Sequence, residues 1–314
     1  MSLIKGLNKK RFQPHLCCLR NQAIETDKMA AARFLFDEID CPKINLDFIS
    51  FRKLDITLKL WKLCKFIKTN RIDILQTYFQ DPTVMGAMAG KLTSVGNVIA
   101  CFRDMGFWRK NENDIKMKAA YKLCTGYIAN SVAVKNEFKK VYGLLPAKID
   151  VIYNGIDHKN YLFDPAKRIN TREPIKVAIV ANLNRDVKRV DIFIKAAAYI
   201  LKTEKNVDFY IAGDGPLKQA LINLCKQLKI EKRVNFCGLV TTNVGGNPEI
   251  ITDRYNGFLV PKNDYQALGK KILSIFEEIG LYKTIRNNAR EYLNKNFSLD
   301  KCIRQYELYY QKLI

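Results

Sequence analysis

Short runs of apolar residues alternate with longer amphipathic segments along most of the chain. This alternation is typical of a parallel β-sheet with helices on both faces. In the first half it predicts strands at residues 15–19, 72–77, 97–100, 127–130 and 148–152. A helix is predicted across residues 57–68, with a buried stripe formed by Leu58, Trp61, Leu63 or Cys64, and Phe66.

A polar stretch at residues 160–174 contains two prolines and has no hydrophobic period, so it predicts a linker between two domains. Beyond it, the pattern predicts strands at 175–183, 207–213 and 233–240, helices at 191–203 and 217–228, and a final helix at 299–313. The length of 314 residues also favours two domains. We therefore predict an α/β protein with a first domain at residues 1–165 and a second at 166–314.

The chain is strongly basic, with 53 Lys and Arg against 31 Asp and Glu and a net charge of +22. Such a charge attracts phosphate groups, nucleic acid or an anionic membrane surface. The basic residues are spread along the sequence, so a solvated basic surface is the alternative explanation. Because no helix-turn-helix, zinc-finger or RNA-recognition motif is present, no specific nucleic-acid partner is predicted.

The cysteine and histidine patterns do not predict a metal site. None of the nine cysteines forms a Cys-x-x-Cys pair, and the two histidines, His15 and His158, are far apart in the sequence. No apolar run reaches the roughly 18 to 20 residues of a membrane span, and the first residues do not form a signal peptide. We expect a cytoplasmic protein without a cofactor, whose charge would allow peripheral contact with the inner membrane face.

Ligands of open α/β sheets bind beyond the carboxyl ends of the strands, where two candidate groups occur in the second half. Arg185 and Lys188 follow a predicted strand and precede a helix. Cations at a helix N-terminus oppose the helix dipole unless an anion such as a diphosphate binds there. A solvated basic turn is the alternative. Gly213 and Gly215 follow the next strand and would let a ligand approach the backbone.

Two further segments carry candidate chemistry. Gly245, Gly246 and Asn247, followed by a proline and Glu249, could form an anion-binding helix start or only a well-capped helix. In the first half, Arg103 and Asp104 follow a strand next to aromatic residues. This pair could bind sugar hydroxyls, or it could be an internal ion pair beside core aromatics.

Taken in order, the segments CFRDMGFW, YIANSVAVKNEF, KIDVIYNGID, VAIVANLNRDVKRVDIFIKAAA, DFYIAGDGPL, VGGNPEI and NGFLVP resemble retaining glycosyltransferases of the GT-B fold. The resemblance covers residues 3–312. It implies two Rossmann-like domains, with a nucleoside-diphosphate-sugar bound to the second and a glycan or lipid-linked acceptor to the first. Transfer would proceed with retention, without a metal ion and without an enzyme nucleophile.

The resemblance also implies roles for individual residues. Arg185 and Lys188 match the diphosphate-binding pair, Gly213 and Gly215 the turn near the nucleotide, and Gly245, Gly246, Asn247 and Glu249 the loop near the donor. Arg103 and Asp104 would act at the sugar and acceptor site, and Asn130, Ser131, Asn154, Gly155 and Asp157 would line the rest of the cleft.

The chain departs from this pattern in two places. Only six residues separate Gly238 from Gly245, whereas the family carries two further β-α units of roughly 40 residues there, with a Glu-x7-Glu donor motif. The start of the chain resembles the family's first helix without the preceding strand. We therefore expect a shortened second domain. The alternatives to a transferase are an inactive truncated remnant that at most binds nucleotide phosphates and, less favoured, a basic nucleic-acid-binding protein.

Overall fold

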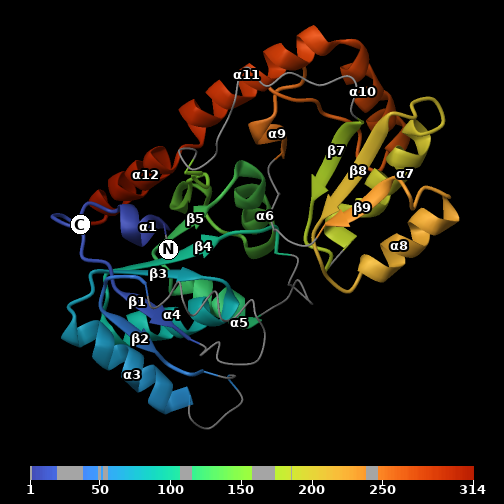
Figure 1. The fold of residues 1–314 in the computed structure, drawn as a ribbon. Helices are drawn as coiled ribbons and strands as arrows, with labels where there is room; N and C mark the ends of the chain where they lie inside the picture. The colour runs from blue at the N-terminus through green and yellow to red at the C-terminus, as the bar shows by residue number, and fades with distance from the viewer. Residues whose placement is uncertain are drawn as a thin grey trace. The chain divides into compact units, whose positions relative to one another are not determined.

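The computed structural model describes residues 2–19, 38–48, 51, 56–106, 115–157, 174–184, 186–237 and 247–314. The chain divides into two compact units. The first joins Met1–Asn160 to Asn294–Ile314, and the second is Tyr161–Leu293. Figure 1 labels their helices and strands.

The first unit contains a four-stranded parallel sheet in the order β3-β4-β5-β6 and a separate parallel pair, β1-β2. The strands are β1 (Leu16–Cys18), β2 (Lys43–Asn45), β3 (Ile74–Tyr78), β4 (Asn97–Phe102), β5 (Gly126–Ala129) and β6 (Ile149–Val151). All five strands predicted for this half are confirmed, and β2 was not predicted. Five of the six residues of β4 are buried, as expected for a strand covered on both faces.

Helices cover this sheet on both sides (Figure 1). They are α1 (Ser2–Gly6), α3 (Ile56–Thr69), α4 (Gln80–Thr93), α5 (Ile115–Lys122), α6 (Val132–Tyr142) and α12 (Leu299–Gln311), with a short 3-10 turn, η1 (Pro146–Lys148). The predicted helix at 57–68 is confirmed as α3, and Leu63 of its predicted stripe is buried, but the prediction was wrong for Leu58 and Trp61. Leu60, Leu63 and Ile67 pack against α4, which leaves Leu58 and Trp61 50% and 57% exposed.

The final helix packs in the first unit, whereas the sequence grouped it with the second domain. Tyr306, Tyr309 and Tyr310 of α12 are buried against Cys101 of β4 and Ile128 of β5. Their spacing of three and four residues places them on one face of the helix. This aromatic face covers the side of the sheet opposite α4 and α5 (Figure 1).

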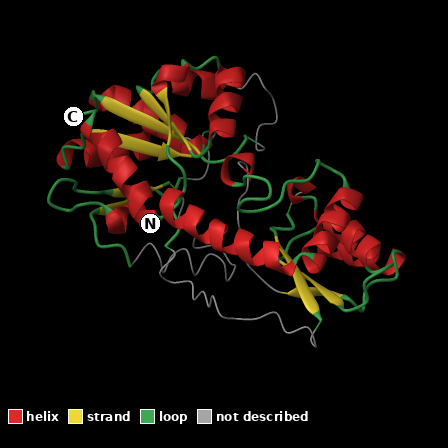
Figure 2. Cartoon of the chain, turned by 90° about the horizontal axis from the view of Figure 1, so that it is seen from above, coloured by secondary structure: helices red, strands yellow, loops and turns green. Residues whose placement is uncertain are grey.

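The second unit contains a three-stranded parallel sheet in the order β7-β8-β9 within the described residues. Its elements are β7 (Ile175–Val180), η3 (Asp186–Lys188), α7 (Val190–Ile200), β8 (Val207–Ala212), α8 (Lys218–Gln227), β9 (Val234–Cys237), α9 (Asn247–Ile250), α10 (Tyr265–Glu277) and α11 (Ile279–Asn296), which continues into the first unit. The predicted strands and helices here are confirmed. In Figure 2 the strands of each sheet lie side by side.

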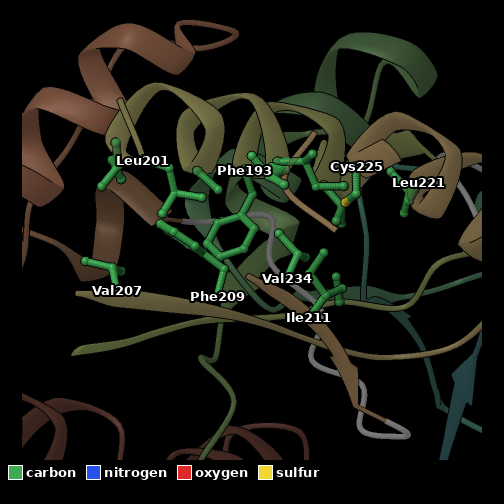
Figure 3. Packing of buried hydrophobic residues seen from close by; sticks show 14 of the residues in the cluster. Phe193, Leu201, Val207, Phe209, Ile211, Leu221, Cys225 and Val234 are labelled. Carbon is green, nitrogen blue, oxygen red and sulfur yellow. The ribbon is translucent and has the colours of Figure 1, made fainter. Parts of the chain in front are cut away.

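One face of the second sheet forms the core of this unit. Phe193 of α7 meets Phe209 of β8 edge to face, with ring centroids 5.8 Å apart (Figure 3). The other face of β7 presents the exposed Lys176, Ala178 and Val180. The prediction of two covered faces therefore does not hold for β7, whose alternating burial is that of a strand covered on one side. None of the described helices is long and apolar enough to cross a bilayer.

Candidate active site

Arg103 is the centre of a side-chain network in the first unit, one residue beyond the carboxyl end of β4. Its guanidinium donates a hydrogen bond of 3.3 Å to the Tyr306 hydroxyl and another to Oδ1 of Asn154. The guanidinium carbon also lies 5.7 Å from the centroid of the Tyr78 ring. The structure thus brings Arg103 and Asn154 together, and it adds two tyrosines that the sequence did not assign to the site.

The two tyrosines of this network stay neutral because their hydroxyls are buried. Burial raises the pKa of Tyr306 and the pKa of Tyr78 well above the ordinary value of 10, although the nearby Arg103 opposes the shift. Burial also raises the pKa of the Cys101 thiol to about 12. Because these groups remain neutral at physiological pH, the positive charge of Arg103 is not neutralised by a phenolate or a thiolate.

Asn130 and Asp104 supply oxygen atoms beside Arg103. The amide of Asn130 donates a hydrogen bond of 2.9 Å to the Arg103 carbonyl, while its Oδ1 is buried and has no partner among the described residues. Asp104 Oδ1 accepts a hydrogen bond of 2.7 Å from the Gly106 amide. A buried acceptor without a donor is unusual in a folded protein. This edge of the sheet therefore places acceptor oxygens of Asn130 and Asp104 next to Arg103.

Phe79 marks the same edge, although no sequence signal pointed to it. It follows β3, is 62% exposed, and has a φ of 67°. Because its ψ is −179°, Phe79 lies in a backbone region that is almost exclusive to glycine, which costs about 1–3 kcal/mol. Phe79 also lines a small pocket with Arg103 and Asp104. Residues with a strained backbone of this kind cluster at functional sites, so we include Phe79 in the candidate site.

Three other predicted cleft residues have different surroundings. Ser131 is buried and caps α6, accepting a hydrogen bond of 3.2 Å from the Val134 amide. Gly155 packs against the start of α12, because a Cβ there would lie 2.6 Å from Leu299 Cα. Asp157 is half-buried just after this contact. The structure thus gives Ser131 and Gly155 clear roles in folding.

Lys188 occupies an unusual position in the second unit, in the turn η3 just before α7. Its side chain is half-buried, and its amino nitrogen is buried without a hydrogen-bond partner in the described part of the chain. Burial lowers the pKa of Lys188 from its ordinary value. The N-terminus of α7 has no side-chain cap. A cation without a partner among the described residues, placed at a helix N-terminus, favours an anion there.

The glycine turn after β8 packs directly against the segment after β7. A Cβ on Gly213 would lie 1.8 Å from the Ala181 carbonyl oxygen, and one on Gly215 would lie 2.5 Å from the Leu183 carbonyl carbon. Leu183 donates a backbone hydrogen bond of 3.1 Å to the Asp214 carbonyl. Both glycines are therefore needed to bring two strand ends of this sheet together.

Arg189, the neighbour of Lys188, is fully engaged. It donates two hydrogen bonds of 2.9 Å to the carboxylate of Asp191 and one to Asn263. The Arg189 hydrogen bond is the main reason that the pKa of Asp191 is lowered. Arg189 therefore holds the turn in place, and of the two neighbouring cations Lys188 is the one without a described partner.

The predicted donor loop is described only in part. Arg185, Gly245 and Gly246 lie outside the described residues. Asn247 begins the four-residue helix α9, which also contains the half-buried Glu249. The buried Asn256 fixes the segment that follows α9: its amide donates 2.9 Å to the Ile250 carbonyl, and its Oδ1 accepts 2.7 Å from the Thr252 amide.

Comparison with known proteins identifies the family. The profile of Glycosyltransferase Family 4 matches residues 1–160, and that of Glycosyl transferases group 1 matches residues 163–240 and 237–292. The chain belongs to the group 1 glycosyltransferases of the GT-B fold. The two pieces of the second match meet near residues 237–240, beside the stretch in which the sequence predicts a missing segment. That missing segment stays a prediction, because residues 238–246 lie outside the described part.

Individual relatives of this glycosyltransferase agree with the assignment. It is 26% identical over 207 residues to N-acetyl-alpha-D-glucosaminyl L-malate synthase of Bacillus anthracis, an alignment that covers 53% of this chain and only 54% of the relative. It is 21% identical to the UDP-Gal:alpha-D-GlcNAc-diphosphoundecaprenol alpha-1,3-galactosyltransferase of Escherichia coli, covering 95% and 88% of the two chains. The Anabaena protein HepE in complex with UDP-glucose shares the fold, with a TM-score of 0.74, 18% identity, and coverage of 95% and 99%.

Proposed function

We propose that the chain transfers a sugar from a nucleoside-diphosphate-sugar to a hydroxyl of a glycan or lipid-linked acceptor, with retention and without a metal ion. The amino nitrogen of Lys188, which is buried and has no hydrogen-bond partner among the described residues, carries this proposal. It lies beside the uncapped N-terminus of α7, and the turn containing Gly213 and Gly215 packs against the end of the neighbouring strand. A diphosphate bound there would provide the anion that this position lacks.

The chemistry follows from where charge develops. As the bond between the sugar and the diphosphate breaks, negative charge grows on the departing diphosphate. A cation and helix amides that are already fixed in a partly dry site stabilise this charge at little reorganisation cost. The acceptor hydroxyl attacks the anomeric carbon on the face from which the diphosphate leaves and passes its proton to the departing diphosphate oxygen on that face, so no enzyme nucleophile is required.

The first unit would contribute the groups that bind hydroxyls. Arg103 supplies N–H donors, while Asp104 and the unpartnered Oδ1 of Asn130 supply acceptors. Two relatives support these substrate classes. HepE binds UDP-glucose, and the Escherichia coli relative is named for a UDP-sugar donor and a lipid diphosphate acceptor. A uridine donor is therefore the first to test.

A thermal unfolding scan with UDP, GDP and their sugars tests the donor site, because a ligand of the native state raises Tm. Lys188→Met should abolish the shift, and Lys226→Met, on an exposed position of α8, should preserve it. Incubation with UDP-sugars and chelator then tests turnover and metal independence. A shift without any turnover would support the inactive remnant, and salt-sensitive DNA binding that displaces UDP would support the nucleic-acid protein.

A further inference from the structure

The outer surface of α3, α4 and α5 is unusually apolar. In α3 and α4 the exposed large hydrophobic side chains occur in pairs at helical spacing, whereas α5 contributes one at its first residue and another follows its last residue. The exposed residues are Leu58 and Trp61 of α3, Met88 and Leu92 of α4, Ile115 of α5, and Leu123 just after α5. Leu92 is 62% exposed and Ile115 is 77% exposed. We refer to this surface as the α3–α5 face.

The same face is rich in lysine and poor in acid. The three helices contain four, one and three lysines, respectively, and a single acidic residue, Asp81, in the first turn of α4. The exposed lysines are Lys62, Lys65, Lys68, Lys91, Lys116 and Lys122. The amino nitrogen of Lys65 lies 5.3 Å from the centroid of the exposed Trp61 ring. Cations are therefore interleaved with apolar side chains across the face.

The three helices form one continuous surface. Met85 and Ala89 of α4 pack with α3, and Ala87 of α4 packs with α5, so α4 lies between its two neighbours. Figure 1 shows α3, α4 and α5 on the lower side of the strands, with α12 on the upper side. Met88 and Leu92 point away from both contacts because they lie on the remaining side of α4.

The face also reaches the functional edge of the sheet. The chain enters α4 directly from the carboxyl end of β3, and α3 leads into the amino end of β3, so both helices begin near the edge that carries Arg103. Leu58 and Trp61 lie in the first two turns of α3. The exposed Leu58 and Trp61 thus lie in the half of this helix that is nearer to the candidate acceptor site of the same unit.

We propose that the α3–α5 face binds peripherally to the surface of an anionic lipid bilayer. Lysine ammonium groups would contact lipid phosphates, while Trp61, Leu58 and Leu92 would enter the boundary between headgroups and acyl chains. The aliphatic Leu58, Leu92 and Ile115 favour a bilayer over nucleic acid, because aliphatic side chains do not stack on bases as an aromatic ring does. The inference does not depend on the proposed transfer reaction, because vesicle binding is measured without a donor or acceptor.

Vesicle flotation and tryptophan fluorescence test this contact on the full chain. Trp61 and Trp108 are the two tryptophans of the sequence, so a Trp108→Phe background leaves Trp61 as the only reporter. With vesicles of phosphatidylcholine and phosphatidylglycerol, the protein should float and the Trp61 emission should shift to the blue and be quenched by brominated acyl chains. With phosphatidylcholine alone, or at high salt, binding should fall by about tenfold or more.

Matched variants separate the α3–α5 face from the overall charge. Lys62→Glu with Lys65→Glu should reduce binding by at least about tenfold, and Leu58→Ala with Trp61→Ala should also reduce it. Lys226→Glu with Lys232→Glu makes the same change of charge on exposed positions of the second unit and should leave binding nearly unchanged. Unaltered Tm values confirm that the variants fold.

Three results would overturn the proposal. One is equal loss of binding in the control pair, which would indicate a general charge effect. Another is stronger binding to oligonucleotides than to anionic vesicles, with Trp61 emission unchanged by lipid. The third is a concentration-dependent dimer that is abolished by Leu58→Ala with Trp61→Ala, which would show that a second copy of the chain covers the face.

Discussion

Replacement of Lys188 by methionine should stabilise the ligand-free protein while removing donor binding. Methionine preserves the length and much of the apolar volume of the side chain, but it removes the buried ammonium that has no partner within the described residues. Most substitutions destabilise a protein. A gain in stability together with a loss of donor binding is therefore the specific result expected if Lys188 is a buried cation that binds an anionic ligand.

The size of the gain can be bounded. A buried polar group without a partner costs about 1–3 kcal/mol, and more if it is charged. Since the Lys188 side chain is half-exposed as a whole, we take the lower end, a gain of about 1 kcal/mol. For a unit of the size of Tyr161–Leu293, this corresponds to a rise in Tm of roughly 3–5 °C.

The gain should also depend on pH in a defined direction. The pKa of Lys188 is lowered in the folded protein from its ordinary value of 10.5. Between these two values the unfolded chain binds a proton that the folded protein has released, so the stability contributed by this residue rises with pH. The advantage of Lys188→Met over wild type should therefore be full below the folded pKa and disappear as pH rises toward 10.5.

Urea unfolding at several pH values, with and without UDP, measures both effects. The neighbouring Arg189 is the control, because its guanidinium is bound by Asp191 and Asn263. Arg189→Met removes these hydrogen bonds and should lower stability, in the opposite direction from Lys188→Met. If Lys188→Met is less stable than wild type at neutral pH, or if it retains the full UDP-induced rise in Tm, the anion-site reasoning is refuted.

Three further predictions follow from individual contacts. Gly213→Ala should lower the free energy of unfolding by about 3 kcal/mol or more, because the added Cβ would lie 1.8 Å from the Ala181 carbonyl oxygen. Gly96→Ala is the control, since nothing lies within 4 Å of its Cβ, and in the same urea series its free energy of unfolding should change by no more than about 0.5 kcal/mol. Tyr306→Phe removes a hydrogen bond to Arg103, so kcat should fall about fivefold while the UDP-induced Tm shift persists. Ser131→Ala should cost about 1 kcal/mol through loss of the α6 cap, with the UDP shift unchanged in a thermal scan.

The strands were largely predictable from the sequence because they are buried. β4 and β5 are short apolar runs and have low exposure along almost their whole length. β2 escaped prediction because it has three residues, with only Ile44 half-buried between exposed Lys43 and Asn45. Such a strand depends on pairing with β1, and the sequence around it does not encode that pairing locally.

Helix orientation was harder to predict than helix position. In α3, apolar residues occur on nearly every side, so periodicity alone does not decide which of them face inward. Packing against Met85 and Ala89 of α4 selects Leu60 and Leu63 and leaves Trp61 exposed. The location of α12 was not predictable for a related reason, since its aromatic face fits any apolar sheet and the sequence does not say which one.

The residues of the candidate site also differ in whether the sequence alone could predict them. Lys188 could be predicted because its conflict is local: a cation beside a helix N-terminus opposes the dipole whatever the rest of the chain does. The network around Arg103 could not be predicted, since Arg103 and Tyr306 are 203 residues apart and meet only after α12 packs on the sheet of the first unit. An unfavourable local arrangement, such as a cation at a helix N-terminus, can thus be recognised from the sequence alone. A network of side chains that are distant in the sequence can be recognised only in the folded structure. Lys188, a cation at a helix N-terminus in the sequence and without a partner among the described residues, is therefore the strongest single reason to expect an anionic substrate here.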